Sequence, residues 1–169
     1  MRSVNALLPP AISVLSAEEA PEGFSARYDA LSRSYAYRVL ARPERSPFEG
    51  GRALWWPHRC DLDALQACAA ALPGRHDFTA FTPADSYHHR FDREVVSARW
   101  ERRGDLVEFT IEAESFLRSM NRVLVGTMLE VASGRRSVED FVALLGGAPR
   151  EAAGVTAPAR GLYLTRVRY

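Results

Sequence analysis

The alternation of hydrophobic and polar residues predicts strands in three parts of the chain. From Ser34 to Leu40, apolar residues recur at every second position, as in a half-buried strand. Residues 94–113 alternate on both sides of a turn at 103–105, which predicts a β-hairpin. In the first strand of this hairpin we expect one face to carry Val96, Ala98 and Trp100. Residues 162–169 form the last predicted strand.

Other segments lack this alternation and predict helices. Residues 116–132 are apolar at most positions, which is typical of a helix buried on most sides. Asp61 is an N-cap candidate for a helix over 61–72, and Ser137 with Asp140 resembles a capping box for a short helix. Strands and helices in this order predict one α+β domain over residues 1–169. We expect an antiparallel sheet with the helices packed on one of its faces.

Two arginines interrupt the apolar helix. Arg118 and Arg122 are spaced i,i+4, so they would lie on one face of its first two turns. A guanidinium is costly to bury unless it meets an anionic partner. Either both side chains reach solvent or pair with Glu114, or the helix end places an arginine at a site for a phosphate or a catalytic carboxylate.

Composition narrows the class of protein. A length of 169 residues with 47% hydrophobic content suits one domain with a real core, and the net charge of +1 gives no global field for nucleic acid. All 22 basic residues are arginine, which suits RNA contact but also follows from a GC-rich genome. Cys60 and Cys68 predict free thiols in a reducing cytosol. With no signal peptide or membrane-spanning run, we expect a soluble cytoplasmic protein without a membrane partner.

Motifs for several common chemistries are missing. The pairs His76-Asp77 and His88-His89 have no further ligand at metal spacing, so we expect no metal site. There is no nucleophile elbow, and Gly146-Gly147 follows a helix rather than opening one as a phosphate loop does. Trp55-Trp56 either packs in the core or offers a stacking surface for bases.

Four segments, taken in order with the arginine helix, carry a resemblance to a known family. They are Phe24–Ala30, Arg33–Arg38, Gly74–Phe81 and Ala153–Leu164. In this order they resemble the C-terminal part of the TruA family of tRNA pseudouridine synthases, and the likeness runs from Val4 to Tyr169. The resemblance implies the fold of the C-terminal half of such a synthase.

The resemblance also implies a specific activity. Members of this family isomerise uridine to pseudouridine in the anticodon stem-loop of tRNA, need no cofactor and act as homodimers. An aspartate carries the reaction, as nucleophile or as the base that acts on the sugar. The expected partner of this chain is therefore tRNA, with a homodimer expected of the full-length enzyme.

The motif matches assign roles to individual residues. Tyr35 falls on the active-site tyrosine that contacts the target base, and Arg122 falls on the arginine that pairs with the catalytic aspartate. We expect Tyr35 to lie at the open face of the sheet, within side-chain reach of Arg122. The remaining matches are RNA-contacting positions: Phe24, Ser25, Ala26, Arg27, Tyr28, Arg42, Trp55, Asp85, Ser86, Tyr87, His88 and His89.

The chain also departs from the family pattern. None of its eight aspartates follows an Arg-Thr pair, whereas the catalytic aspartate of the family lies in a Gly-Arg-Thr-Asp motif. Thr82 stands where an arginine is usual, and Asn121-Arg122-Val123 replaces Val-Arg-Asn. Residues 2–8 resemble the end of a helix and lead into an apolar run, 11–15, suited to a strand. We therefore expect a fragment or a truncated reading frame that is inactive alone, or a shortened paralogue kept as a non-catalytic RNA-binding module.

Overall fold

A mainly antiparallel sheet lies at the centre of the computed structural model, which describes residues 2–86 and 88–169. Within these residues the sheet has six strands in the order β2-β1-β5-β4-β3, and β6 pairs with β1 beside β2. The strands are β1 (Ser32–Leu40), β2 (Leu54–Trp55), β3 (Gly74–Asp77), β4 (Asp92–Arg103), β5 (Leu106–Ala113) and β6 (Leu162–Arg168). Every pairing is antiparallel except the short contact between β1 and β2. The predicted hairpin corresponds to β4 and β5, and the strands predicted at 34–40 and 162–169 correspond to β1 and β6; all are confirmed.

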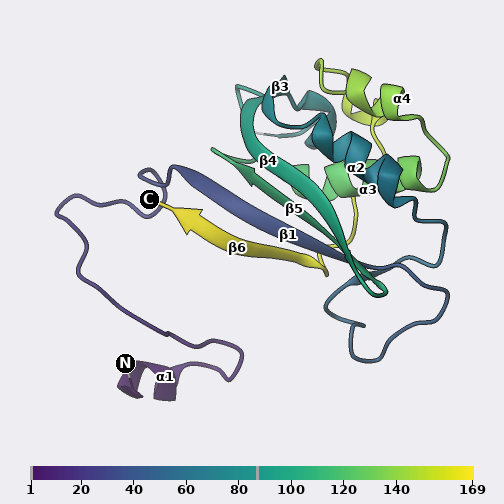
Figure 1. Cartoon of the computed structure of the whole chain (residues 1–169). Coiled ribbons are helices and arrows are strands. Elements are labelled where there is room, and N and C mark those ends of the chain that lie inside the picture. Colours follow the sequence, from purple (N-terminus) through teal and green to yellow (C-terminus); the bar gives the residue numbers. More distant parts are fainter. Residues whose placement is uncertain (1, 87) are drawn as a thin grey trace.

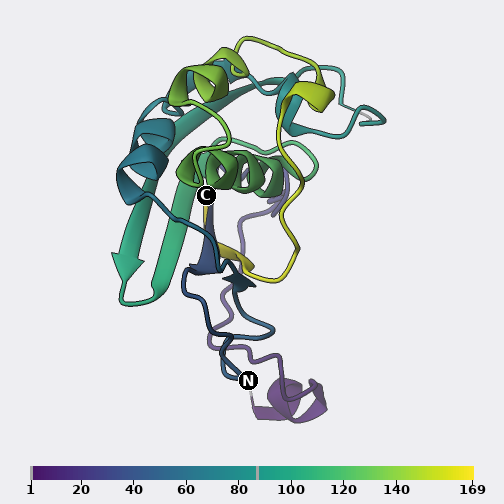
Figure 2. The same ribbon diagram turned by 90° about the vertical axis from the view of Figure 1, so that its right-hand side faces the viewer.

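The helices of the domain gather over one face of this sheet (Figures 1 and 2). They are α2 (Leu62–Ala70), α3 (Met120–Ala132) and α4 (Val138–Ala143), with two short 3-10 helices, η1 (Thr79–Phe81) and η2 (Arg150–Ala152). A further helix, α1 (Arg2–Leu7), stands apart at the end of an extended segment (Figure 1). The prediction of an α+β fold, with an antiparallel sheet and helices packed on one of its faces, is confirmed.

The core lies between the sheet and α3. Tyr37 and Val39 of β1 stand opposite Phe109 and Val107 of β5, and all four side chains are buried. Directly opposed residues in an antiparallel pair share a face, so these four define the side of the sheet that the helices cover. The indole of Trp100, on β4, extends the same layer and donates to the sulfur of Met128 at 3.4 Å.

One strand departs from simple alternation. The register between β4 and β5 shifts between Val95 and Ser97, which marks a β-bulge. A bulge adds one residue to one strand and so reverses which side chains face inward. Val95 is therefore 1% exposed while Val96 is 55% exposed. The prediction that Val96 shares the face of Trp100 is wrong for this reason.

The apolar helix begins later than the sequence predicts. Ser119 has a φ of 61°, in the left-handed region, and this breaks the chain direction before α3 begins at Met120. Arg118 consequently lies outside the helix, and only Arg122 lies in its first turn. The predicted i,i+4 stacking of the two arginines on one helix face is wrong.

Local signals at other helix ends are confirmed. The Asp61 carboxylate accepts from the Ala64 amide at 3.2 Å, and the capping box of Ser137 and Asp140 has both of its bonds. Residues 11–15 form no strand; instead the Asn5 side chain bonds both the amide and the carbonyl of Val14. The Asn5 side chain thus satisfies the backbone hydrogen-bonding groups of Val14, which a neighbouring strand would otherwise satisfy.

Candidate functional site

Arg122 is held at the start of α3 by a segment that crosses the helix. Its Nε donates to the carbonyl of Ala157 at 2.6 Å, and the Ala157 amide donates to the Arg122 carbonyl at 3.0 Å. One turn further along, the Gly154 amide donates to Thr127 Oγ1 at 3.0 Å. The segment around 153–158 therefore fixes both the backbone and the guanidinium of Arg122.

Gly126 makes this crossing possible. A Cβ at this position would lie 1.8 Å from the Val155 carbonyl oxygen, far inside any contact distance. Only glycine lets the backbone of residues 153–157 lie directly on α3. Two parts of the family-like pattern, the arginine helix and the 153–164 segment, thus form one unit.

The two tyrosines of β1 point toward this unit. The Tyr37 hydroxyl donates to the Pro158 carbonyl at 2.7 Å, and burial raises the Tyr37 pKa to about 12 against the opposing charges of Arg122 and Arg160. Tyr35 lies on the same face of β1, opposite Ile111, and its ring meets that of Phe116 edge-on at 5.0 Å.

This position differs from the predicted one. Tyr35 lies on the helix-bearing face of the sheet and not on its open face, because its cross-strand partner Ile111 belongs to the core. Among the described residues, no hydrogen bond or ring contact joins Tyr35 to Arg122. The tyrosine that lies within the field of Arg122 is Tyr37, two residues along β1 from Tyr35.

Arg122 has no acidic partner in the described part of the chain. Its side chain is half-buried, and its only hydrogen bond is the one from Nε to the Ala157 carbonyl. None of the ion pairs between described residues involves it. The outer nitrogens of the guanidinium are thus available to an anion.

The segment from Phe24 to Tyr28 forms a compact turn at the end of the sheet. The Ser25 amide donates to the Asp29 carboxylate at 2.8 Å, and the Phe24 ring packs edge-on against Tyr169 at 5.0 Å. The Tyr169 hydroxyl donates to the Ala26 carbonyl. Arg27 is exposed and lies over the ring of Tyr28, itself 79% exposed. The Asp29 carboxylate binds the Ser25 amide, and it forms no ion pair with Arg27.

Arg33 joins this turn to the rest of the site, a role that the sequence does not reveal. One guanidinium nitrogen donates to the carbonyls of Ala30 and Glu114, and the other donates to the carbonyl of Arg27 at 2.6 Å. Carbonyls from two distant segments converge on one side chain. The turn at 24–30 is thereby fixed beside the segment that leads into α3.

The loop at 85–89 is tied to the same segment. Asp85 forms an ion pair with Arg118, and Thr82 donates to the Arg118 carbonyl at 3.0 Å. Arg118 thus pairs with Asp85 and not with Glu114. Burial lowers the pKa of His88, and the positive charges of Arg93, Arg118 and His89 lower it further. Ser86 is half-buried, His89 is exposed, and Tyr87 lies outside the described residues.

Arg42 and Trp55 lie elsewhere. Trp55 ends β2 and Arg42 lies just beyond the end of β1, and the eight steps from Ser32 to Leu40 put that end of β1 about 26 Å from the end that adjoins the 24–28 turn. Arg42 pairs with Asp105 at 2.9 Å, and Trp55 donates to the Arg42 carbonyl. Arg45 covers the Trp55 ring at 4.5 Å. Both predicted RNA contacts therefore take part in holding a loop.

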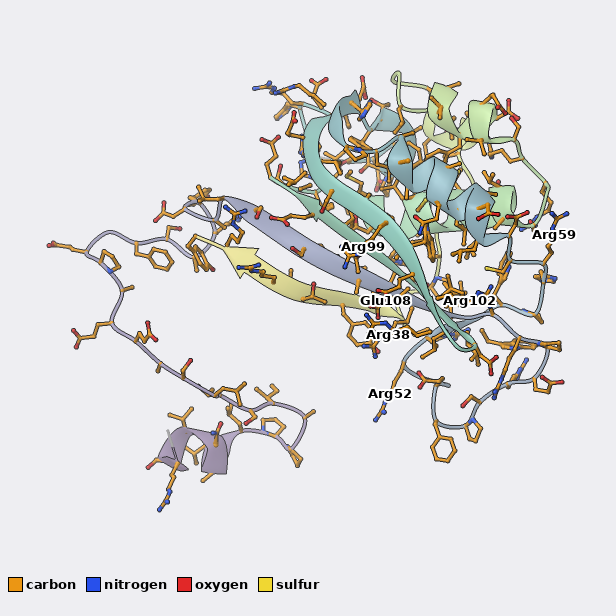
Figure 3. The ribbon with its side chains drawn as sticks, in the orientation of Figure 1. Arg38, Arg52, Arg59, Arg99, Arg102 and Glu108 are labelled. Carbon is orange, nitrogen blue, oxygen red and sulfur yellow. The ribbon has the colours of Figure 1, made fainter. Side chains whose placement is uncertain are left out.

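The open face of the sheet carries a different arrangement of arginines. Arg38 of β1 pairs with Glu108 of β5 at 2.9 Å and lies over the ring of Tyr163, and Arg99 stands on β4, the next strand beyond β5 (Figure 3). The hydrogen bond that Arg38 donates to the Glu108 carboxylate is the main cause that raises the pKa of Arg38. Arginine and carboxylate charges are interleaved here, as on a solvated surface.

In residues 2–86 and 88–169, no three His, Cys, Asp or Glu side chains gather as metal ligands. No helix in this part of the chain has the length and apolarity needed to cross a membrane. His76 and Asp77 are separately engaged: the Asp77 carboxylate accepts from the amide and hydroxyl of Thr79.

The comparisons with known proteins identify the family. A family model described as tRNA pseudouridine synthase matches residues 68–169, and the chain belongs to that family. Proteins named tRNA pseudouridine synthase A are similar over nearly the whole chain. That of Bacillus pumilus is 39% identical over 99% of this chain and 68% of its own length, and that of Thermus thermophilus is 40% identical over 99% and 67%. That of Allorhizobium ampelinum is 41% identical over 94% and 61%. The chain thus spans about two thirds of the length of these relatives.

Proposed function

We propose that this chain supplies the RNA-binding part, and part of the active-site cleft, of an enzyme that isomerises uridine to pseudouridine in the anticodon stem-loop of tRNA. The observation that carries the proposal is Arg122, anchored through Nε with its outer nitrogens unpaired. An arginine beside a carboxylate lowers the carboxylate pKa and keeps it ionised. The matched aspartate would come from a Gly-Arg-Thr-Asp sequence, which does not occur in these 169 residues.

The reaction assigns work to the residues of this chain. Cleavage of the N-glycosidic bond frees the uracil, which turns and rejoins the sugar through carbon 5, and the proton of carbon 5 is lost to solvent. Tyr35 would hold the flipped base on an aromatic surface, with Phe116 fixing the orientation of its ring. The turn at 24–28 and the loop at 85–89 would hold the RNA backbone. Action in the cytoplasm, as a homodimer and without a cofactor, belongs to the same proposal.

Tritium release tests the proposal. A tRNA carrying tritium at carbon 5 of uridine should release none when incubated with this chain alone, because the aspartate is lacking. Adding a separately expressed N-terminal half that contains Gly-Arg-Thr-Asp should produce release, and the same half with asparagine in place of the aspartate should not. Release by the chain alone would contradict the assignment of the catalytic group.

The RNA-binding module is the alternative, and the same experiment separates the two. If the chain binds tRNA and no complementing half restores release, the module is the better description. If the chain binds no tRNA, both descriptions fail.

A further inference from the structure

A polar pocket of about 580 Å³ lies next to the loop at 85–89. Its arginines come from separate elements: Arg75 from β3, Arg93 from β4 and Arg90 from the loop between them. The antiparallel pairing of β3 and β4 sets Arg75 opposite Glu94 and His76 opposite Arg93, which brings these distant parts of the sequence together. Glu114 and Ser115, from the segment before α3, close the other side.

The arginine charges of this pocket are not balanced. None of the ion pairs between described residues includes Arg75, Arg90 or Arg93. Arg93 donates to the carbonyls of Arg90 and Asp92, and its Nε is buried without a hydrogen-bond partner. A partly buried cation with an unsatisfied donor is unfavourable unless an anion joins it.

The lining of the pocket has a net positive charge, because it holds Arg75, Arg90 and Arg93 against the carboxylates of Asp92 and Glu114. Burial is the main cause that lowers the pKa of Arg93; Glu114 opposes this effect, Arg90 adds to it and Asp92 opposes it. Burial also lowers the pKa of His88 on the pocket wall, and the charges of Arg93, Arg118 and His89 lower it further.

The pocket also lies on a continuous path between two segments that resemble RNA contacts. Arg33 fixes the Glu114 carbonyl beside the 24–30 turn, and Arg118 fixes the 85–89 loop through Asp85. An RNA strand in contact with both the 24–30 turn and the 85–89 loop would pass over the pocket. We propose that the pocket binds one backbone phosphate of the RNA substrate, with Arg93 and Arg90 as its main donors and Arg75 at its rim. The phosphodiester identity of the ligand rests on the proposed function, while the pocket as an anion site does not.

The salt dependence of tRNA binding tests the proposal. Each phosphate that a protein neutralises adds about 0.7 to 0.9 to the slope of log affinity against log salt. Arg90→Ala should weaken tRNA binding about 3- to 10-fold and reduce the salt slope by about 0.7 to 0.9, the value for one phosphate. The variant should still fold, because the Arg90 side chain is exposed. Arg103→Ala removes an arginine at the far end of β4 that is paired with Glu101; it is the matched control and should change neither the affinity nor the slope.

Inorganic phosphate provides a separate readout. In the wild-type chain, phosphate should shift the imidazole NMR signals of His88 and His89, and Arg90→Ala or Arg93→Gln should abolish the shift at unchanged circular dichroism. If wild type binds no tRNA yet shows this shift, the anion site stands and the proposed function fails. If tRNA binds with an unchanged slope in Arg90→Ala and phosphate shifts neither histidine, the pocket proposal is wrong while the function survives.

Discussion

The two ends of β4 carry arginines in opposite situations. Arg93 and Arg103 are ten residues apart, about 33 Å along the strand. Arg103 pairs with Glu101 at 3.0 Å, and this hydrogen bond raises its pKa. Arg93 forms no ion pair with any described residue, and burial lowers its pKa. Strand β4 thus carries an arginine that is paired with a carboxylate near the hairpin turn, and at its other end an arginine that has no ion-pair partner among the described residues.

The difference separates arginines that serve the fold from arginines available to a ligand. Arg38 and Arg42, nearer the hairpin, meet Glu108 and Asp105. Among the described residues, the Arg27 guanidinium contacts the Tyr28 ring and the Arg122 guanidinium contacts the Ala157 carbonyl, and neither meets a carboxylate. The number of arginines in the chain therefore does not indicate which of them can bind RNA. The presence or absence of a carboxylate beside each arginine is the better indicator.

Arg122→Met should abolish isomerisation by a complete enzyme, by at least about a thousandfold, if Arg122 holds the catalytic carboxylate ionised. In the isolated chain it should change the free energy of unfolding by no more than about 1 kcal/mol, because the lost bond to Ala157 is offset by removal of a half-buried charge. Tritium release and urea denaturation give the two values. Unfolding of the isolated variant would show that Arg122 is structural.

Gly126→Ala should destabilise the chain by about 1–3 kcal/mol or more, since the new methyl group meets the Val155 carbonyl. Thermal unfolding followed by circular dichroism measures this. Gly104→Ala is a suitable comparison, because a Cβ there meets nothing within 4 Å, although its positive φ of 63° carries a smaller cost of its own. Equal stability of the two variants would contradict the close crossing over α3.

Arg33→Ala should destabilise the chain by about 1–3 kcal/mol and weaken tRNA binding, because three carbonyls lose a charged donor and the 24–30 turn is released. Hydrogen exchange should accelerate at residues 24–30 and stay unchanged at the 103–105 hairpin turn. A uniform increase over the whole chain would mean that Arg33 does not act locally.

His88 should titrate below its ordinary pKa of about 6.5. Because the folded state disfavours the protonated ring, the contribution of His88 to stability is complete above about pH 6.5 and is lost as the pH falls toward the folded pKa. Arg93→Gln should raise the His88 pKa toward 6.5, and Arg103→Ala should leave it unchanged. An NMR titration of the imidazole signals distinguishes these outcomes.

The sequence predicts the periodic elements of the fold but not its local interruptions. The hairpin of β4 and β5 and the helices α2 and α3 follow from hydrophobic spacing and caps. The bulge after Val95 and the left-handed Ser119 do not, because each is a single backbone change with no composition of its own. Their effects are large: one turns Val96 to solvent, and the other removes Arg118 from the helix.

The candidate site was predictable where short motifs carry it. Tyr35, Arg122 and the 24–28 and 85–89 segments are contiguous in sequence or match a family pattern. Arg33 and the pocket arginines were not predictable, because their roles depend on carbonyls and charges that only the strand pairing brings near. Arg42 was predicted as an RNA contact, but its guanidinium pairs with Asp105, which lies 63 residues away and which the sequence alone does not place beside it.

The central claim is that RNA contacts the end of the sheet that carries Arg27, Arg90 and Arg93, none of which forms an ion pair with a described residue. The most direct measurement is the NMR spectrum of arginine Nε–H groups during titration with an anticodon stem-loop RNA. We predict that the signals of Arg27, Arg90 and Arg93 shift with added RNA, while those of Arg42 and Arg103 stay in place. Shifts confined to Arg42 and Arg103, or spread equally over both ends of β4, would contradict the account.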